Sequence, residues 1–280
     1  MARDTSFSYS FLVLPAEQRR GLGVVWDFCR AVDDAVDEAE SPAIAAAEVL
    51  NWRAEVGRLF GSESPVTPQG RNLKPYVGMF SLSRQPFDDL VDGVEMDLKQ
   101  SRYETFDELI GYCRRVASAV GMMCIEVFGC RDSDSRDYAF NLGLALQITN
   151  IIRDIKADLK QGRVYLPQED LSRFGVTEAA LAAGVVTEPV RALLAHECQR
   201  ARHFFTAARQ AMPHGETRKL VAAEIMGGIY FEILQRIERR GYDVFSERIR
   251  VPKIVRARIA LQIWAWSQLS AFSLTRSARA

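Results

Sequence analysis

The segment NIIRDIKAD, residues 150–158, places oxygen-bearing side chains at helical spacing within an otherwise apolar stretch. Asn150, Asp154 and Asp158 follow at four-residue steps, so on an α-helix they form one stripe two turns long. The rest of this helix is strongly apolar, with Leu142, Leu146, Ile148, Ile151 and Ile155. Buried polar groups need partners. The stripe therefore predicts either a bound ligand or simple surface ion pairs with Arg153 and Lys156.

A second acidic segment, DDAVD at residues 33–37, repeats the pattern. Asp33 and Asp37 share one helical face, and two carboxylates about 4 Å apart repel by roughly 4 kcal/mol in a moderately polar site. A hard cation relieves this repulsion, since Mg²⁺ prefers oxygen ligands and substrate phosphates. Arg30 lies one turn before Asp33 and can reach the same phosphate. One cluster alone fits a solvated acidic surface, but two clusters on two helices favour a magnesium and diphosphate site.

Composition sets the broad class of the protein. The chain has 280 residues and 48% hydrophobic content, enough for one large domain with a sizeable core. Lys+Arg and Asp+Glu balance at 36 each, so we expect no nucleic-acid partner. Five cysteines without a C-x-x-C pair argue against a disulfide framework. No signal-peptide pattern opens the chain, and we expect a cytoplasmic protein.

Helical periodicity dominates the chain, and strand alternation is hard to find. A first helix carries Leu22 to Val36 and the first acidic segment. Residues 61–86 are rich in Pro and Gly, with a short helix expected from Pro75 to Leu82. A loop is expected from Gly162 to Thr177. The remaining expected helices cover residues 43–60, 88–99, 105–128, 133–160 (capped by Asp132 or Ser133), 189–212, 216–240 and 251–274. The pattern predicts an all-α fold of eight to ten helices around a central cavity.

Three segments in this order carry a family resemblance: CRAVDDAVD at 29–37, QITNIIRD at 147–154 and GRVYLP at 162–167. Together they resemble the squalene/phytoene synthase family, and weaker similarity extends from about Ser6 to Arg258. The resemblance implies a single all-α isoprenoid synthase domain over residues 1–280, in which 251–280 form a C-terminal helix and tail. It also implies head-to-head (1'-1) condensation of two prenyl diphosphates.

The resemblance also assigns roles to residues by motif position. Two or three Mg²⁺ ions would be bound by Asp33, Asp37, Asp154 and Asp158, with Asn150 assisting. Tyr112 and Tyr230 would join these aspartates in the catalytic set as tyrosines of the reaction cavity. The diphosphates would be bound by Ser6, Arg30, Gln147, Asn150, Arg153, Arg248 and Arg256.

Carbocation chemistry of this kind needs an apolar, aromatic cavity that excludes water. The aromatic residues expected there are Phe7, Phe11, Trp26 and Phe231, and the alternative for each is an ordinary core position.

Within the family, three further segments narrow the expected reaction. Residues 6–15, 92–98 and 240–245 look most like bacterial presqualene diphosphate synthases of the hopanoid pathway. Such an enzyme joins two farnesyl diphosphates, releases diphosphate and stops at the cyclopropyl product. No G-x-G-x-x-G segment is present, and NADPH is not expected. The alternatives are phytoene or dehydrosqualene synthase, a squalene synthase that uses NADPH and, less favoured, a silent assembly factor.

The C-terminal segment allows two interpretations. Residues 254–274 mix large apolar side chains, including Trp264 and Trp266, with flanking cations such as Lys253 and Arg258. Such a helix can lie peripherally on the inner face of a membrane, or it can close the core. The uncharged run within it, Ile259 to Thr275, is too short and too polar for a membrane span, and the sequence leaves the oligomeric state undefined.

Overall fold

A 28-residue helix, α8 (Ser133–Lys160), forms the centre of the computed structural model, which describes residues 11, 13–213 and 215–277. Its start is fixed locally, because the Asp132 side chain accepts a hydrogen bond from the Asp134 N–H at 3.1 Å, as an N-cap residue does. This confirms the predicted helix start. Thirteen of its residues are buried, so α8 is packed on several sides rather than along one face.

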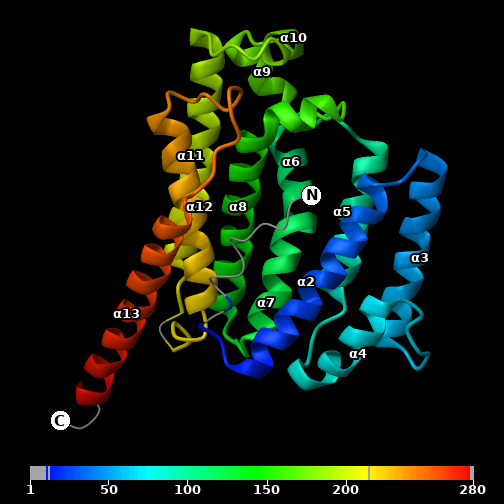
Figure 1. The fold of residues 1–280 in the computed structure, drawn as a ribbon, viewed down its shortest axis with the longest axis vertical. Helices are drawn as coiled ribbons and strands as arrows, with labels where there is room; N and C mark the ends of the chain where they lie inside the picture. The colour runs from blue at the N-terminus through cyan, green and yellow to red at the C-terminus, as the bar shows by residue number, and fades with distance from the viewer. Residues whose placement is uncertain (1–10, 12, 214, 278–280) are drawn as a thin grey trace.

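The other helices surround α8 (Figure 1). It contacts α6, α7, α10, α11, α12 and a π-helical segment between α6 and α7. The bounds are α2 Ala16–Asp37, α3 Pro42–Phe60, α4 Pro68–Phe80, α5 Gln85–Lys99, α6 Phe106–Cys113, π-helix Arg114–Ser118, α7 Ala119–Val127, α9 Gln168–Phe174, α10 Glu178–Ala182, α11 Glu188–Gln210, α12 Val221–Arg239 and α13 Lys253–Ser277. The α2–α5 group lies on one side of the molecule, and α13 packs on α12 and extends past the bundle.

The predicted all-α class is confirmed. Within the described ranges the only β-type pairing is an isolated parallel bridge between Arg102 and Val164. Buried apolar side chains form one continuous core cluster. None of the helices in this part of the chain is long and apolar enough to cross a membrane.

Three expected boundaries are wrong. The helix expected from Glu216 begins at Val221, after a turn. The helix expected at 75–82 begins at Pro68, because Thr67 caps it by accepting the Gly70 N–H at 2.9 Å. Pro75 lies inside this helix rather than at its start, where it removes one helical hydrogen bond. The loop expected at 162–177 contains the short helix α9, since Pro167 allows a helix to begin just after it.

The helix expected from Thr105 to Phe128 is interrupted by the π-helical segment. At this point α8 comes very close, because a Cβ added to Gly143 would lie 2.6 Å from the Ser118 Cα. Only glycine permits this approach of the two backbones. The π-helical segment and α8 therefore form a closely packed wall.

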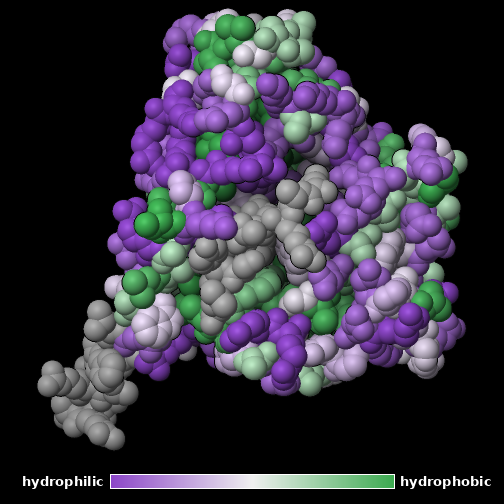
Figure 2. Space-filling view, in the orientation of Figure 1, coloured by the Kyte–Doolittle hydropathy of each residue, from purple (hydrophilic) through white to green (hydrophobic). Residues whose placement is uncertain are grey.

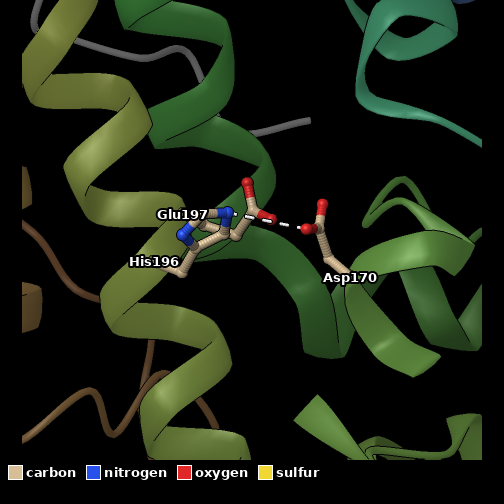
Figure 3. Close-up of side chains that lie close together, drawn as sticks. All are labelled: Asp170, His196 and Glu197. Atoms are coloured by element: carbon tan, nitrogen blue, oxygen red, sulfur yellow. Dashed lines mark ion pairs between the residues drawn. The ribbon is translucent and has the colours of Figure 1, made fainter. Parts of the chain in front are cut away.

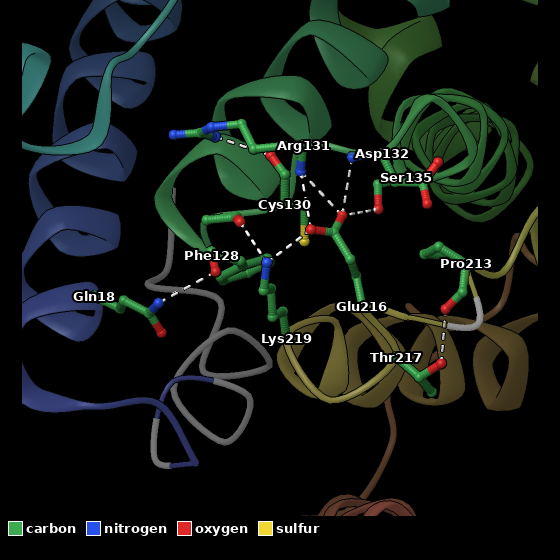
Figure 4. Close-up of polar contacts among 11 residues, drawn as sticks. Gln18, Phe128, Cys130, Arg131, Asp132, Ser135, Pro213, Glu216, Thr217 and Lys219 are labelled. Carbon is green, nitrogen blue, oxygen red and sulfur yellow. Dashed lines mark hydrogen bonds and ion pairs between the residues drawn. The ribbon is translucent and has the colours of Figure 1, made fainter. Parts of the chain in front are cut away.

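Glu216, which precedes α12, holds the start of α8 in place (Figure 4). Its carboxylate accepts hydrogen bonds from the N–H groups of Arg131 and Asp132, at 2.9 and 3.1 Å, and from the Ser135 hydroxyl at 2.7 Å. Lys219 donates to the same carboxylate at 2.7 Å. Burial alone would raise the Glu216 pKa, but these hydrogen bonds outweigh it and lower the pKa to about 2.

We expect Glu216→Gln to lower the free energy of unfolding at pH 7 by about 1–3 kcal/mol, the range for hydrogen bonds to charged groups. Because the folded pKa lies below the ordinary value of 4.5, the ionised carboxylate stabilises the protein above pH 4.5. That contribution is lost as the pH falls towards 2. Urea unfolding of both proteins should therefore show a difference that narrows below pH 4.5. The exposed Glu63→Gln serves as control, and an equal effect from this substitution would contradict the role of Glu216.

Candidate active site

A cavity of about 700 Å³ lies between α2, α7, α8 and α12, with residues 248–256 at its edge. Its lining changes character along α8. Towards the C-terminal end of the helix the lining residues are Gln147, Asn150, Asp154 and Asp158, whereas Leu142 and Leu146 lie towards the start. The cavity therefore has a charged end and an apolar end.

The structure brings the candidate site residues to this one cavity. Those in the described part of the chain that line it are Arg30, Asp33, Asp37, Tyr112, Gln147, Asn150, Arg153, Asp154, Asp158, Tyr230, Arg248 and Arg256. Ser6 lies outside the described residues. The structure thus tests the placement of these side chains, and their individual roles stay predictions.

Two of the aspartates carry a strong electrostatic cost. Desolvation by neighbouring protein atoms, followed by repulsion from Asp37, raises the pKa of Asp33 to about 7, although the side chain is still exposed to solvent. Burial, followed by repulsion from Asp154, raises the pKa of Asp158 to about 7. Each acidic segment therefore contains one carboxyl group whose ionised form is poorly compensated by the protein alone.

Arginines compensate the other two aspartates. Arg163 donates to Asp37 at 2.8 Å. The Asp154 carboxylate accepts hydrogen bonds from Arg153 at 3.0 Å and from Arg248 at 3.1 Å. Burial would raise the Asp154 pKa, but these two guanidinium groups outweigh it and the pKa is lowered.

The donor set at the charged end fits Mg²⁺. All of the predicted ligands are oxygen atoms, the type that Mg²⁺ prefers. The Oδ1 atom of Asn150 is buried without a hydrogen-bond partner, and an unpaired buried acceptor costs free energy. Oxygen atoms of Asn150, Asp33 and Asp158 are therefore available to bind a hard cation.

A separate cluster of possible metal ligands lies away from this cavity, between α9 and α11 (Figure 3). In the part of the chain that the structure describes, only Asp170, His196 and Glu197 bring three His, Cys, Asp or Glu ligand atoms within 4.8 Å of one another. Arg200 contacts both carboxylates and lies 2.9 Å from the Glu197 Oε1. The single charge of Arg200 balances one carboxylate, and burial raises the pKa of Glu197 to about 8, so Glu197 is largely protonated at neutral pH. The cluster therefore acts as a polar network that joins the two helices.

Three residues of the charged end were not among the sequence candidates. Asp97 accepts hydrogen bonds from the hydroxyl groups of Tyr112 at 3.0 Å and Tyr165 at 2.9 Å, and burial is the main cause that raises its pKa. Arg163 pairs with Asp37 across the cavity. The signal for Arg163 and Tyr165 was present in the GRVYLP segment. Asp97 lies in residues 92–98, a segment that was used only to narrow the expected reaction.

The apolar end agrees in part with the expected aromatic lining. Phe11 and Trp26 line the cavity, and Phe7 lies outside the described residues. The expectation for Phe231 is wrong, because its ring packs edge-to-face on Phe205 at 5.2 Å and lies below Arg202 and Arg209, away from the cavity. Position on α12 explains the difference, since Tyr230, one residue earlier, faces the cavity instead.

Known proteins resemble this chain over most of its length. A family model described as Squalene/phytoene synthase matches residues 1–255. The phytoene synthase of Arthrospira platensis is 36% identical over 255 residues, which are 86% of this chain and 82% of that protein. The 15-cis-phytoene synthase of Synechococcus elongatus is 35% identical over 261 residues, with 88% and 84% covered.

Solved structures show the same similarity. A dehydrosqualene synthase in complex with ligand has a TM-score of 0.86 at 26% identity, covering 95% of this chain and 93% of that one. The squalene synthase HpnC from Alicyclobacillus acidocaldarius has a TM-score of 0.77 at 32% identity, covering 86% and 91%.

We expect Asp33→Asn to raise the melting temperature at pH 8 in EDTA, but by less than the pKa shift alone would give, because the side chain is exposed and solvent screens its charge. The folded pKa of about 7 lies above the ordinary value of 3.8, so ionised Asp33 destabilises the fold progressively as the pH rises between these values. The gain from the substitution should grow over that interval and then level off.

Differential scanning calorimetry with added Mg²⁺ completes this test. Mg²⁺ should stabilise the wild-type protein more than Asp33→Asn, because the substitution removes one ligand. Asp27→Asn, an exposed position on the same helix, is the matched control. An unchanged melting temperature for Asp33→Asn in EDTA at pH 8 would contradict the cost assigned to this carboxylate.

Proposed function

The chain belongs to the squalene/phytoene synthase family of prenyltransferases, and on this premise we propose that it condenses two farnesyl diphosphates head to head, 1'-1, to presqualene diphosphate. The observation that carries the proposal is the division of one cavity into a carboxylate-rich end and an apolar end. A prenyl diphosphate has the same division, with an anionic head and a hydrocarbon chain. Members of this family perform head-to-head condensation.

The cationic side chains at the charged end suit diphosphate binding. Arg30, Arg153, Arg248 and Arg256 all line the cavity, and guanidinium groups bind phosphate oxygens in bidentate fashion. When bound, Mg²⁺ would neutralise diphosphate charge as the C–O bond breaks. Arg248, about half exposed, now contacts Asp154, and we assign it to the diphosphate once a cation takes over that carboxylate.

The apolar end would protect the allylic cation from water. After the first diphosphate leaves with the bonding electron pair, the 2,3-alkene of the second substrate attacks the cation, and loss of a proton closes the cyclopropane ring. The Tyr112 hydroxyl donates to Asp97 at 3.0 Å, and burial raises its pKa well above the ordinary value. Tyr112 therefore stays neutral, and we assign the proton to the departing diphosphate.

Phytoene synthesis from two geranylgeranyl diphosphates is the second candidate. The curated relatives described above are phytoene synthases at 35–36% identity, whereas the similarity to presqualene diphosphate synthases rests on three short segments. Both reactions need the same charged end. They differ in the length of the prenyl chain and in the second diphosphate, which presqualene diphosphate keeps and the hydrocarbon phytoene has lost.

Incubation of purified protein with Mg²⁺ and farnesyl diphosphate, with and without NADPH, is expected to give presqualene diphosphate in both samples by mass spectrometry. Squalene that forms only with NADPH would contradict a reaction that ends at the cyclopropyl product. A strong preference for geranylgeranyl diphosphate would favour phytoene synthesis instead.

The same assay tests the acidic residues. Asp37→Asn and Asp154→Asn should each lower turnover to background, because each removes charge that holds the metal and the diphosphate. Their circular dichroism spectra should stay helical. Asp27→Asn, exposed on α2, should retain turnover, and full activity in either cavity variant would remove that residue from the metal site.

We further propose that α13 contacts an anionic membrane surface. Ile254, Leu261 and Trp264 follow at helical spacing and are 80%, 64% and 44% exposed, and Lys253 and Arg258 beside them are also exposed. Single apolar residues are visible among polar ones on the side of the molecule where α13 runs (Figure 2). Exposed apolar and basic side chains together suit an anionic bilayer surface, which also holds lipid substrates.

Flotation with vesicles that contain anionic lipid tests this contact. Leu261→Ser with Trp264→Ser should lower the bound fraction strongly, since each buried side chain contributes about 1.5–3 kcal/mol. Ile44→Ser with Leu50→Ser removes exposed apolar side chains from α3 and should leave flotation unchanged. Equal flotation of both double variants would contradict the proposed contact.

A further inference from the structure

Tyr138 lies at the apolar end of the cavity. The α8 residues that line the cavity form a stripe from Asp158 back to Tyr138, and no residue of α8 before Tyr138 takes part in the lining. Sixteen residues separate Tyr138 from Asp154, which is about 24 Å along an α-helix. On this wall Tyr138 therefore marks the greatest distance from the diphosphate end.

The Tyr138 side chain is held in place by Glu224. It is 1% exposed, and its hydroxyl donates to the Glu224 Oε1 at 2.6 Å. Glu224 lies in the first turn of α12. Burial raises the pKa of both groups, so the tyrosine stays a neutral donor. Loss of the carboxyl group would leave the buried hydroxyl without this partner, which would release the ring from its position.

Near this end Tyr138 is the largest cavity-lining side chain contributed by α8 and the first turn of α12, while the buried Phe128 lines the cavity from the end of α7. The α12 residues that line the cavity there are the small Ala222 and Ala223, and the next α8 residue is Ala139. The ring of Tyr138 thus takes up space that its small neighbours do not fill.

We infer that Tyr138, positioned by Glu224, limits the length of the prenyl chain that the cavity accepts. This inference rests on the proposed function, since it assumes that the hydrocarbon chain occupies the apolar end. Tyr138 would contact the end of the chain and determine specificity. Glu224 would act through Tyr138 as a positioning residue.

The test compares kcat/KM for geranylgeranyl and farnesyl diphosphates, expressed as a C20/C15 ratio. Tyr138→Ala should raise this ratio about tenfold or more, because even one methylene group changes discrimination by roughly 10–200-fold in an apolar pocket. Glu224→Ala should raise it about fivefold through loss of the hydrogen bond. Glu224→Gln retains an oxygen acceptor and should restore a ratio near that of the wild type.

Leu144→Ala is the matched control, because Leu144 is a buried residue of the same helix outside the cavity lining. It should lower the melting temperature and leave the C20/C15 ratio unchanged. If Tyr138→Ala does not fold, Tyr138→Val gives the same comparison with less lost volume. A ratio within twofold of the wild type in a folded Tyr138 variant would overturn the inference.

Binding separates this inference from the proposed reaction. Calorimetry with unreactive C15 and C20 thiolodiphosphates should show the same shift in affinity ratio for Tyr138→Ala. If the wild-type protein turns over neither diphosphate, the proposed function fails, and the affinity ratio still decides the role of Tyr138. An unchanged affinity ratio would overturn the inference independently of turnover.

Discussion

Repulsion among the carboxylates gathered at one end of the cavity is the constraint on which the structure depends. Asp33, Asp37, Asp97, Asp154 and Asp158 all line that end. Folding alone does not neutralise them, since the pKa values of Asp33 and Asp158 rise to about 7. A cation that binds here together with an anionic substrate would relieve this repulsion. Binding at this end should therefore raise the free energy of unfolding.

The arginines divide this charge unevenly. Arg163 and Arg153 compensate Asp37 and Asp154, while Asp33 and Asp158 keep little compensation. Each acidic segment therefore has one carboxylate held in position and one that needs an added cation. Such a division fixes the geometry of the site before any ligand arrives, and preorganised charge is effective because it need not reorient during reaction.

The all-α fold class and most of the candidate site residues could be predicted from local sequence patterns. A four-residue spacing already determines which side chains share a helical face. The rest depended on contacts between distant segments. Asp97 lies 15 residues from Tyr112 and 68 from Tyr165, and no local pattern links them. The helix start at Pro68 depends on the Thr67 side chain, which accepts a capping hydrogen bond from the Gly70 N–H. The sequence alone did not show whether the helix begins there or at Pro75.

The glycine contact between α8 and the π-helical segment has a consequence for the engineering of this protein. At Gly143 the wall consists of backbone against backbone, so a larger side chain there would separate two helices rather than reshape the space between them. Libraries that aim at new products therefore gain little from substitutions at Gly143. Positions whose side chains line the cavity, such as Trp26 of α2, Tyr138 of α8 and Met226 of α12, are the useful ones.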